Sequence, residues 1–317
     1  MDMHKHLILL SGILLGAAVS TPVYAQSANT PQNTKNTTSD TAALLPPSSS
    51  PSVLVVAPSA SSPTSTQVVS VSPDTKPTGV EADPAAPQPS AWGQILSQYT
   101  VQASNGGPTL FDYKALAASP SDMEKLAHYI QNLSVQKPST MDRAHAMAYW
   151  ANLYNALTVQ VVAQNYPVKS IREIKSGWHK GPWRRELVTV EGEKLSLDSI
   201  EHGIMRPTFK TPLVHYMVNC ASIGCPNLKP TPWRAETLDA DLENAARTYI
   251  NSPRGVNIVK GRLTVSSIYR WFRKDFGNNE ADIIAHLLAY ADNPLKARIV
   301  GFKKIDKYKY NWDVNAP

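Results

Sequence analysis

The residues best suited to chemistry in this chain lie close together, within positions 215–226. This stretch reads His-Tyr-Met-Val-Asn-Cys-Ala-Ser-Ile-Gly-Cys-Pro and holds both cysteines of the chain, Cys220 and Cys225, together with Asn219. The apolar run 213–218 predicts a short strand that ends in a polar turn. Because strand ends often present polar groups to a ligand, we expect these residues to line a functional site.

The two cysteines allow three kinds of chemistry. Their C-x4-C spacing favours a disulfide, Cys220–Cys225, if the protein reaches an oxidising compartment. A thiolate nucleophile at Cys220 would need a base, for which His202 and His215 are the candidates. A zinc site built from these four residues would match no standard ligand spacing, so we predict no metal. The spacing does not decide between the disulfide and the nucleophile.

The position of His215 argues against a simple dyad with Cys220. His215 stands five residues before Cys220, and strand residues an odd number apart point to opposite faces. His202 is expected to lie on a separate short helix, which Ser196 caps. Strand alternation does not constrain it, so it is free to approach Cys220. The adjacent Glu201 points in another direction on that helix, and we interpret it as a surface or capping carboxylate.

A long apolar segment predicts the central helix that must position these groups. Residues 139–165 begin with a capping Ser-Thr pair and are apolar nearly all round, as expected of a helix packed on both flanks. Asn152 and Asn155 lie inside this helix, and buried amides are costly unless they are hydrogen-bonded. These two asparagines, like Asn219, are candidates either to brace neighbouring backbone or to bind a ligand.

Three tryptophans are further binding candidates. Trp150 lies in the central helix, whereas Trp178 and Trp183 lie in the loop 177–185, where they alternate with cations. Aromatic rings interleaved with cations either stack on a ligand or plug the core from a loop.

The remaining periodicity predicts the fold class. Amphipathic helices are expected to begin at Ala91, after Ser119-Pro120 and near Trp233, and hairpins are expected over 187–195 and 256–265. Helices first, followed by hairpins mixed with helices, predict an α+β fold in which the central buried helix packs on an antiparallel sheet.

Composition divides the chain into three parts. Residues 1–25 combine a cationic start, a short apolar run and a small-residue end, which predicts a cleaved signal peptide. Residues 26–90 are rich in Ser, Thr, Pro and Ala and contain no aromatic residue, which predicts a disordered linker. Residues 91–317 form the predicted folded domain. We therefore expect an exported protein, periplasmic or secreted, without a transmembrane anchor once the signal is removed.

Charge gives a weak indication about partners. The chain carries a formal net charge of +6, of which 1–25 contribute zero and 26–90 contribute −2, leaving +8 for 91–317. The partner is unknown from sequence, and this bias suits an acidic glycan or peptide of the envelope. We expect no nucleic acid partner. We also expect no cofactor, since no Walker loop or dinucleotide glycine pattern is present.

Four ordered motifs resemble one known family. They are the sequences at 148–157, 196–206, 215–226 and 312–315, and together they resemble the domain of unknown function 547 over about Ala91 to Asn315. The family has no assigned reaction. Its layout is similar to papain- and transglutaminase-like folds, which place a nucleophilic cysteine at the start of the central helix. Here that helix has no cysteine, and Asn152 stands near the expected thiol position.

Two functional hypotheses follow from these observations. The first is a thiol-dependent hydrolase or acyl transferase of the cell envelope that uses Cys220 with His202 or His215. The second is a non-catalytic envelope module that binds a glycan or peptide and contains a structural Cys220–Cys225 disulfide.

Overall fold

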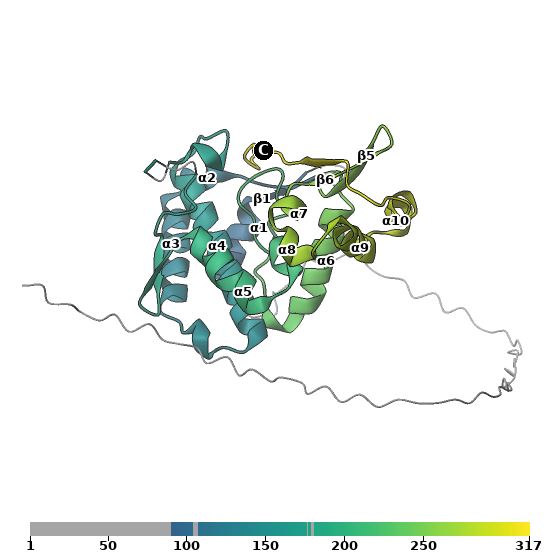
Figure 1. Ribbon diagram of the computed structural model, residues 1–317. Helices are drawn as coiled ribbons and strands as arrows, with labels where there is room; N and C mark the ends of the chain where they lie inside the picture. Colours follow the sequence, from purple (N-terminus) through teal and green to yellow (C-terminus); the bar gives the residue numbers. More distant parts are fainter. Residues whose placement is uncertain (1–89, 104–106, 176, 179–180) are drawn as a thin grey trace, which may run out of the picture. The chain divides into compact units, whose positions relative to one another are not determined.

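The computed structural model describes residues 90–103, 107–175, 177–178 and 181–317 (Figure 1). All of them lie within one compact unit, Gly79–Pro317. The predicted signal peptide and, apart from Ser90, the predicted linker lie outside the described residues. Within the described part of the chain, every helix is too short or too polar to cross a membrane.

The described elements are mostly helices, with three small sheets between them. The helices are α1 (Ala91–Tyr99), α2 (Tyr113–Ala117), α3 (Pro120–Ser134), α4 (Arg143–Gln164), α5 (Arg206–Phe209), α6 (Leu238–Ile250), α7 (Ile268–Trp271), α8 (Arg273–Phe276), α9 (Glu280–Tyr290) and α10 (Asn293–Ile299). The strands are β1 (Thr100–Gln102), β2 (Thr109–Phe111), β3 (Val188–Val190), β4 (Glu193–Leu195), β5 (Val256–Val259), β6 (Arg262–Ser266) and β7 (Lys307–Lys309). Short helical segments are η2 (Pro138–Thr140), η3 (Ile171–Glu173), η4 (Ser199–Met205), η5 (Pro212–Tyr216) and η6 (Ala235–Thr237).

The predicted α+β class is confirmed, but the sheet differs from the prediction. The hairpins β3–β4 and β5–β6 form as expected, and β7 then adds to β6 in parallel, so the largest sheet is mixed. This sheet belongs to a second hydrophobic core that it shares with α6 and α9. The central helix α4 belongs to the first core and packs against α2 and α3. It therefore packs chiefly on other helices rather than on a sheet.

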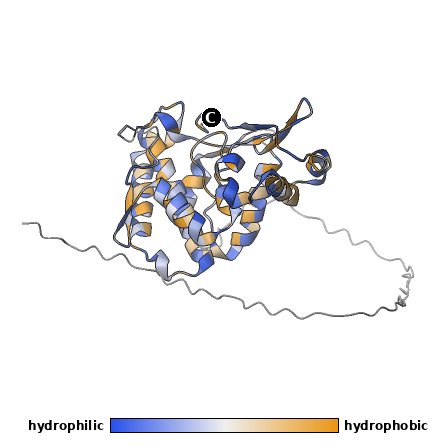
Figure 2. Ribbon diagram, viewed as in Figure 1, coloured by the Kyte–Doolittle hydropathy of each residue, from blue (hydrophilic) through white to orange (hydrophobic). Residues whose placement is uncertain are grey.

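The first core forms because the predicted amphipathic helices bury the expected faces. Ser90 caps α1, and the side chain of Ser119 caps α3 at the Pro120 start, as the sequence indicates. The apolar side chains of α1 at Trp92, Ile95 and Leu96 are fully buried. Figure 2 shows hydrophobic and hydrophilic positions alternating along these helices, as expected when one face packs inward.

Helix α4 begins later than its sequence suggests. Asp142 rather than the Ser139-Thr140 pair caps it, because the Asp142 carboxylate accepts hydrogen bonds from the N–H groups of Ala144 and His145, both at 3.0 Å. Sixteen of its 22 residues are buried, so this helix is enclosed on all sides, and its polar side chains must find partners inside the protein.

The asparagines of α4 find those partners in the backbone. The Asn155 amide donates to the Met217 carbonyl and accepts from the Asn219 N–H, both at 2.9 Å. The Asn152 amide makes the same reciprocal pair with the N–H and C=O of Trp233, both at 2.9 Å. Asn219 continues the chain of contacts by donating to the Pro226 carbonyl at 2.7 Å and accepting from Ala221 N–H at 2.8 Å. All three asparagine side chains therefore hold neighbouring backbone, as one of the two interpretations of the sequence proposed.

The strand predicted over residues 213–218 was wrong. This stretch forms the 3-10 helix η5, which Thr211 caps through its side chain and Pro212 begins. Val214, His215 and Tyr216 are all buried, and an apolar run buried on every side cannot be assigned to strand or helix from periodicity alone. The alternation argument that separated His215 from Cys220 therefore does not apply.

The amide contacts of Asn155 predict a large loss of stability on truncation. Asn155→Ala is expected to lower the free energy of unfolding by about 2–4 kcal/mol, because it leaves a buried carbonyl and a buried N–H without partners. Urea unfolding followed by circular dichroism measures this difference. Asn165→Ala is the matched control, since Asn165 ends the same helix in an exposed position, and it is expected to cost less than about 1 kcal/mol. Equal losses in the two variants would contradict the bracing role.

Candidate functional site

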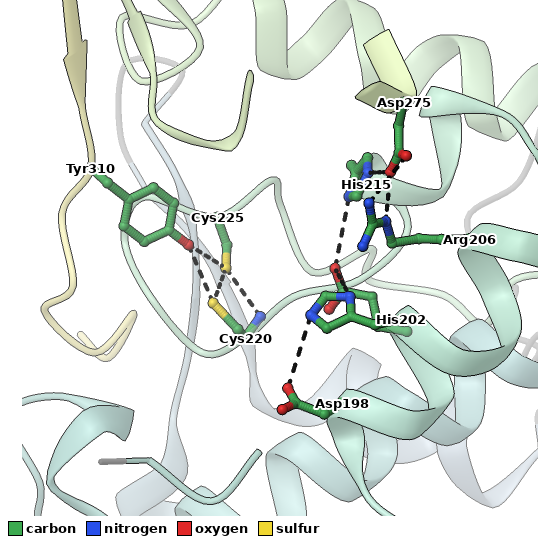
Figure 3. A network of polar contacts seen from close by, with 9 residues as sticks. Asp198, His202, Arg206, His215, Cys220, Cys225, Asp275 and Tyr310 are labelled. Carbon is green, nitrogen blue, oxygen red and sulfur yellow. Dashed lines mark hydrogen bonds and ion pairs between the residues drawn. The ribbon is translucent and has the colours of Figure 1, made fainter. Parts of the chain in front are cut away.

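A pocket of about 180 Å³ collects most of the chemically active side chains of the described residues. Its walls come from α4, η4, η5, the turn after η5, α7 and the C-terminal segment. The lining residues are Tyr154, Trp183, Asp198, Glu201, His202, His215, Val218, Cys220, Cys225, Pro226, Ile268, Trp271, Phe272, Tyr310 and Trp312. Figure 3 shows the thiols with Tyr310 as one group and the histidines with their acidic partners as another.

The two thiols form one hydrogen-bonded group. Both are free cysteines, and their Sγ atoms lie 2.7 Å apart. The Cys220 N–H donates to the Cys225 Sγ at 3.0 Å, and the Tyr310 hydroxyl lies 3.0 Å from the Cys225 Sγ and 3.2 Å from that of Cys220. The turn that brings the sulfurs together uses a left-handed Ala221, at φ 57°. At Gly224 the backbone runs so close to Asn311 that a Cβ would lie 2.8 Å from the Asn311 N and O atoms.

The surroundings of the pair shift the pKa values of the two thiols in opposite directions. Burial raises the pKa of Cys225, but hydrogen bonds from Cys220, from Tyr310 and from backbone outweigh burial, so the pKa is lowered overall. The pKa of Cys220 is raised well above its usual value, first by its hydrogen bond to Cys225 and then by burial. The two sulfurs therefore titrate as a pair, in which Cys220 keeps its proton after Cys225 has lost one.

The segment η4 presents three polar side chains to the pocket. Ser196 and Ser199 cap its start reciprocally: the Ser199 N–H donates to Ser196 Oγ at 3.1 Å, and the Ser196 N–H donates to Ser199 Oγ at 2.6 Å. Asp198, Glu201 and His202 follow at positions i, i+3 and i+4, which share one helix face. The π-helical winding of η4 is a feature that often accompanies functional sites.

Glu201 is not the surface carboxylate that the sequence suggested. It is only 8% exposed, and its Oε1 lies 3.7 Å from His215 Nδ1 and 3.8 Å from His202 Nδ1. His202 also lies 3.9 Å from Asp198 through its Nε2. Glu201 thus stands between both histidines, because the shared face of η4 points inward rather than to solvent.

His215 is held by acidic groups on both of its ring nitrogens. It is 2% exposed, its Nε2 lies 2.7 Å from Asp275 Oδ2, and its Nδ1 faces Glu201. Arg206 secures Asp275 from the other side with two hydrogen bonds of 2.6 and 3.1 Å. The ring of Phe272 stacks on the imidazole with centroids 4.3 Å apart. This arrangement fixes the ring and stabilises its protonated form.

The pKa of His215 and the pKa values of its two acidic partners, Glu201 and Asp275, shift in opposite directions. Burial lowers the pKa of His215, but Asp275 and Glu201 outweigh burial and raise it above its usual value. Burial raises the pKa of Glu201, and contacts with His215, His202 and Tyr154 reverse that effect and lower it. The pKa of Asp275 is likewise lowered despite burial, by His215 and Arg206. Imidazolium and carboxylates therefore stabilise one another.

The structure brings together only part of the predicted site. His202, His215, Cys220, Cys225 and Trp183 all line the pocket. Within the described residues, none of the hydrogen bonds found joins a histidine to a cysteine, and His215 uses both nitrogens on carboxylates. His202, with a side chain 37% exposed, is the imidazole open to the pocket.

The other predicted binding residues lie elsewhere. Trp150, Asn152, Asn155 and Asn219 are buried outside the pocket lining, and the three amides hold backbone in place of a ligand. Trp178 is fully exposed on its loop. For Asn152 and Asn155 the physical reason is that α4 is enclosed on all sides, so its polar groups are used internally.

Sequence reasoning missed several residues of the site. Arg206 and Trp312 were visible in the sequence motifs but carried no predicted role. Asp275 and Tyr310 had no signal at all, because they join the site from 60 and 85 residues further along the chain than the groups they contact. Only tertiary structure reveals such partners.

A metal centre is not indicated in the part of the chain that the structure describes. No group of three or more His, Cys, Asp or Glu side chains there is arranged to hold a metal ion.

Comparison with known proteins assigns a family to the middle of the domain. Residues 138–250 match the family model described as "Protein of unknown function, DUF547". This region of the chain belongs to the DUF547 family. The DUF547 match includes α4, η4, η5 and both cysteines, whereas Asp275, Tyr310 and the closing motif at 312–315 lie beyond it. Comparisons with curated proteins and with solved structures gave no match.

The raised pKa of His215 predicts a particular dependence of stability on pH. The folded state holds the His215 proton more tightly than the unfolded state, so this contribution is complete below the unfolded pKa of about 6.5. It is lost as the pH rises through the raised folded pKa. The stability difference between the wild type and His215→Gln is therefore expected to be largest at low pH and to shrink above neutrality.

Urea unfolding between pH 5 and pH 9 tests this sign. The exposed His128 of α3 supplies the control, and His128→Gln is expected to follow the wild-type pH profile. A wild-type to His215→Gln difference that grows as the pH rises would show that the carboxylates do not hold an imidazolium.

Proposed function

We propose that this protein is an exported, thiol-dependent acyl hydrolase or acyl transferase of the cell envelope. One observation carries the proposal: a hydrogen-bonded thiol pair and the half-exposed imidazole of His202 open into the same pocket, whose walls are mainly aromatic. Acyl transfer needs a nucleophile, a proton donor and acceptor, and a site that limits water access. Export is supported by the composition of residues 1–25.

In this proposal Cys220 is the nucleophile and Cys225 is its proton acceptor. Cys220 is the more exposed of the two residues, and Cys225 has the lowered pKa. As Cys220 Sγ attacks the acyl carbonyl carbon, its proton passes to the Cys225 thiolate and a C–S bond forms. The bond from the carbonyl carbon to the leaving nitrogen or oxygen then breaks, and that atom takes a proton from His202, which acts as the general acid.

The second half returns every group to its starting state. Neutral His202 takes a proton from water, or from an acceptor hydroxyl or amine, whose oxygen or nitrogen attacks the thioester carbon. The C–S bond breaks, and the Cys220 thiolate recovers its proton from Cys225. The sum is transfer of one acyl group to water or to the acceptor. Asp198 and Glu201 flank the His202 ring, at 3.9 Å from its Nε2 and 3.8 Å from its Nδ1.

The assignment predicts which thiol is acylated. Incubation with p-nitrophenyl acetate is expected to place an acetyl group on Cys220, detected by peptide mass spectrometry, and Cys220→Ser is expected to abolish it. His202→Asn is expected to slow acylation or deacylation by about 100-fold, the usual contribution of a positioned acid or base.

A matched control separates this effect from general destabilisation. His145 forms an ion pair with Asp142 at 2.7 Å on the exposed start of α4, so His145→Asn removes an imidazole beside a carboxylate away from the pocket. It is expected to acylate at the wild-type rate. Acetyl transfer that is unchanged in Cys220→Ser or His202→Asn would refute the mechanism.

A second candidate function is a binding module without catalysis. It is favoured by the cluster that Trp183, Trp271 and Trp312 form with Tyr310, whose neighbouring ring centroids lie 4.6 to 5.7 Å apart. Such a rim suits stacking on a glycan or peptide. In this reading Cys220 and Cys225 form a disulfide after export and only hold the turn.

The redox state of the thiols distinguishes the two functions. For an enzyme of the proposed kind, protein prepared without reductant and able to react with p-nitrophenyl acetate is expected to contain free thiols that iodoacetamide labels. Intact-mass measurement before and after reduction checks this. A stoichiometric Cys220–Cys225 bond in protein that retains its ligand binding would instead establish the binding module.

A further inference from the structure

A cationic groove adjoins the thiol pocket and shares two of its walls. The groove, of about 570 Å³, is lined by four cations, Arg206, Arg270, Arg273 and Lys274, and by one carboxylate, Glu280. Trp271 and Phe272 line both the groove and the pocket. A ligand lying over these two rings would therefore reach from the thiols into the cationic groove.

Three of the four cations are free to meet a ligand. Arg206 is occupied by Asp275, whereas none of the ion pairs found in the described residues involves Arg270, Arg273 or Lys274. These three side chains are exposed. Arg270 lies in α7, whereas Arg273 and Lys274 lie in α8, beyond the turn at Phe272. The Arg270 guanidinium lies over the ring of Tyr308, another residue of the groove lining, at 5.9 Å from the ring centroid.

The carboxylate in the groove is already used by the protein. Glu280 accepts hydrogen bonds from the Tyr308 hydroxyl at 2.9 Å and from the Ile305 N–H at 3.0 Å. It therefore stabilises the wall and leaves the exposed cations unpaired. The exposed cations therefore complement a ligand that carries several anionic groups.

We infer that this groove binds the side-chain carboxylates of an acidic peptide whose reacting acyl group lies over Cys220. The inference rests on the proposed function for its orientation, since thiol acyl transfer acts on a carbonyl and a peptide supplies both amide carbonyls and acidic side chains. Alternate residues of an extended peptide point to the same side, about 6.6 Å apart, so every second acidic residue of such a peptide can face the groove. Arg270 and Arg273 offer the planar forks that match carboxylates.

Binding of a fluorescein-labelled hexaglutamate, measured by fluorescence anisotropy, tests the inference without requiring turnover. The wild type is expected to bind hexaglutamate more tightly than labelled hexaglutamine, with an affinity that falls as salt is added. The variant Arg270→Ala/Arg273→Ala/Lys274→Ala is expected to lose at least about tenfold in affinity, as charge-assisted hydrogen bonds are removed.

The control variant removes the same charge from another surface. Lys260→Ala/Lys296→Ala/Arg298→Ala deletes three exposed cations on the β5–β6 turn and α10, and it is expected to bind hexaglutamate as the wild type does. An equal loss of affinity in both variants would show that binding depends only on net charge, and it would overturn the inference that the groove binds the peptide. Equal binding of hexaglutamate and hexaglutamine by the wild type would overturn it as well.

Two further experiments test whether the ligand is a peptide and distinguish this inference from the proposed function. Displacement of labelled hexaglutamate by tripolyphosphate or oligogalacturonate at lower concentration than by unlabelled hexaglutamate would overturn the assignment to a peptide. Bound hexaglutamate is expected to slow iodoacetamide labelling of Cys220, because the groove and the pocket share Trp271. Specific hexaglutamate binding in a protein that p-nitrophenyl acetate does not acylate would refute the catalytic proposal and leave the groove assignment standing.

Discussion

The hydrogen bonds between the Asn155 amide and the backbone around Asn219 are the constraint on which the site depends. They tie the enclosed helix α4 to the segment that runs from η5 into the thiol turn, at Met217 and Asn219, and Asn219 then fixes the far side of that turn through Pro226. A side-chain amide can pair with a backbone N–H and a backbone C=O at once. It therefore supplies the two hydrogen bonds that a neighbouring β-strand would otherwise provide. The sulfurs of the turn are positioned by this relay rather than by a sheet.

The buried charges around His215 are arranged so that their signs balance. Two cations, His215 and Arg206, alternate with two carboxylates, Asp275 and Glu201. Removing charges from water is costly, and the cost is offset only when each has a well-placed partner and further hydrogen bonds. The alternation also spans four separate elements, so it joins η4, α5, η5 and α8 into one wall. His202 stays outside it, with a side chain 37% exposed.

The sequence could predict the parts of this fold that depend on local pattern. The start of α1, the Ser119-Pro120 start of α3, the two hairpins and the α+β class all follow from caps, turn residues and periodicity, and the structure agrees. The sequence could not predict η5, because residues 213–218 are buried on every side and carry no period. It could not reveal Asp275 or Tyr310, because their partners lie far away along the chain. The prediction of a surface position for Glu201 failed for a related reason. Tertiary packing decides which face of a short helix is buried, and the neighbouring residues in the sequence do not indicate it.

The C-terminal segment 310–315 determines when the pocket forms during folding. Tyr310 contacts Cys220 across 90 residues, and Asn315 accepts a hydrogen bond from the Tyr113 hydroxyl across 202 residues. The Ile223 N–H, inside the thiol turn, donates to the Asp313 carbonyl at 2.8 Å. Contacts of such long sequence separation form late, after the local helices they join. A nascent chain can therefore assemble α1 to α4 while its thiols remain outside any finished pocket, and the pocket closes only when residues 310–315 strap the two cores together (Figure 1).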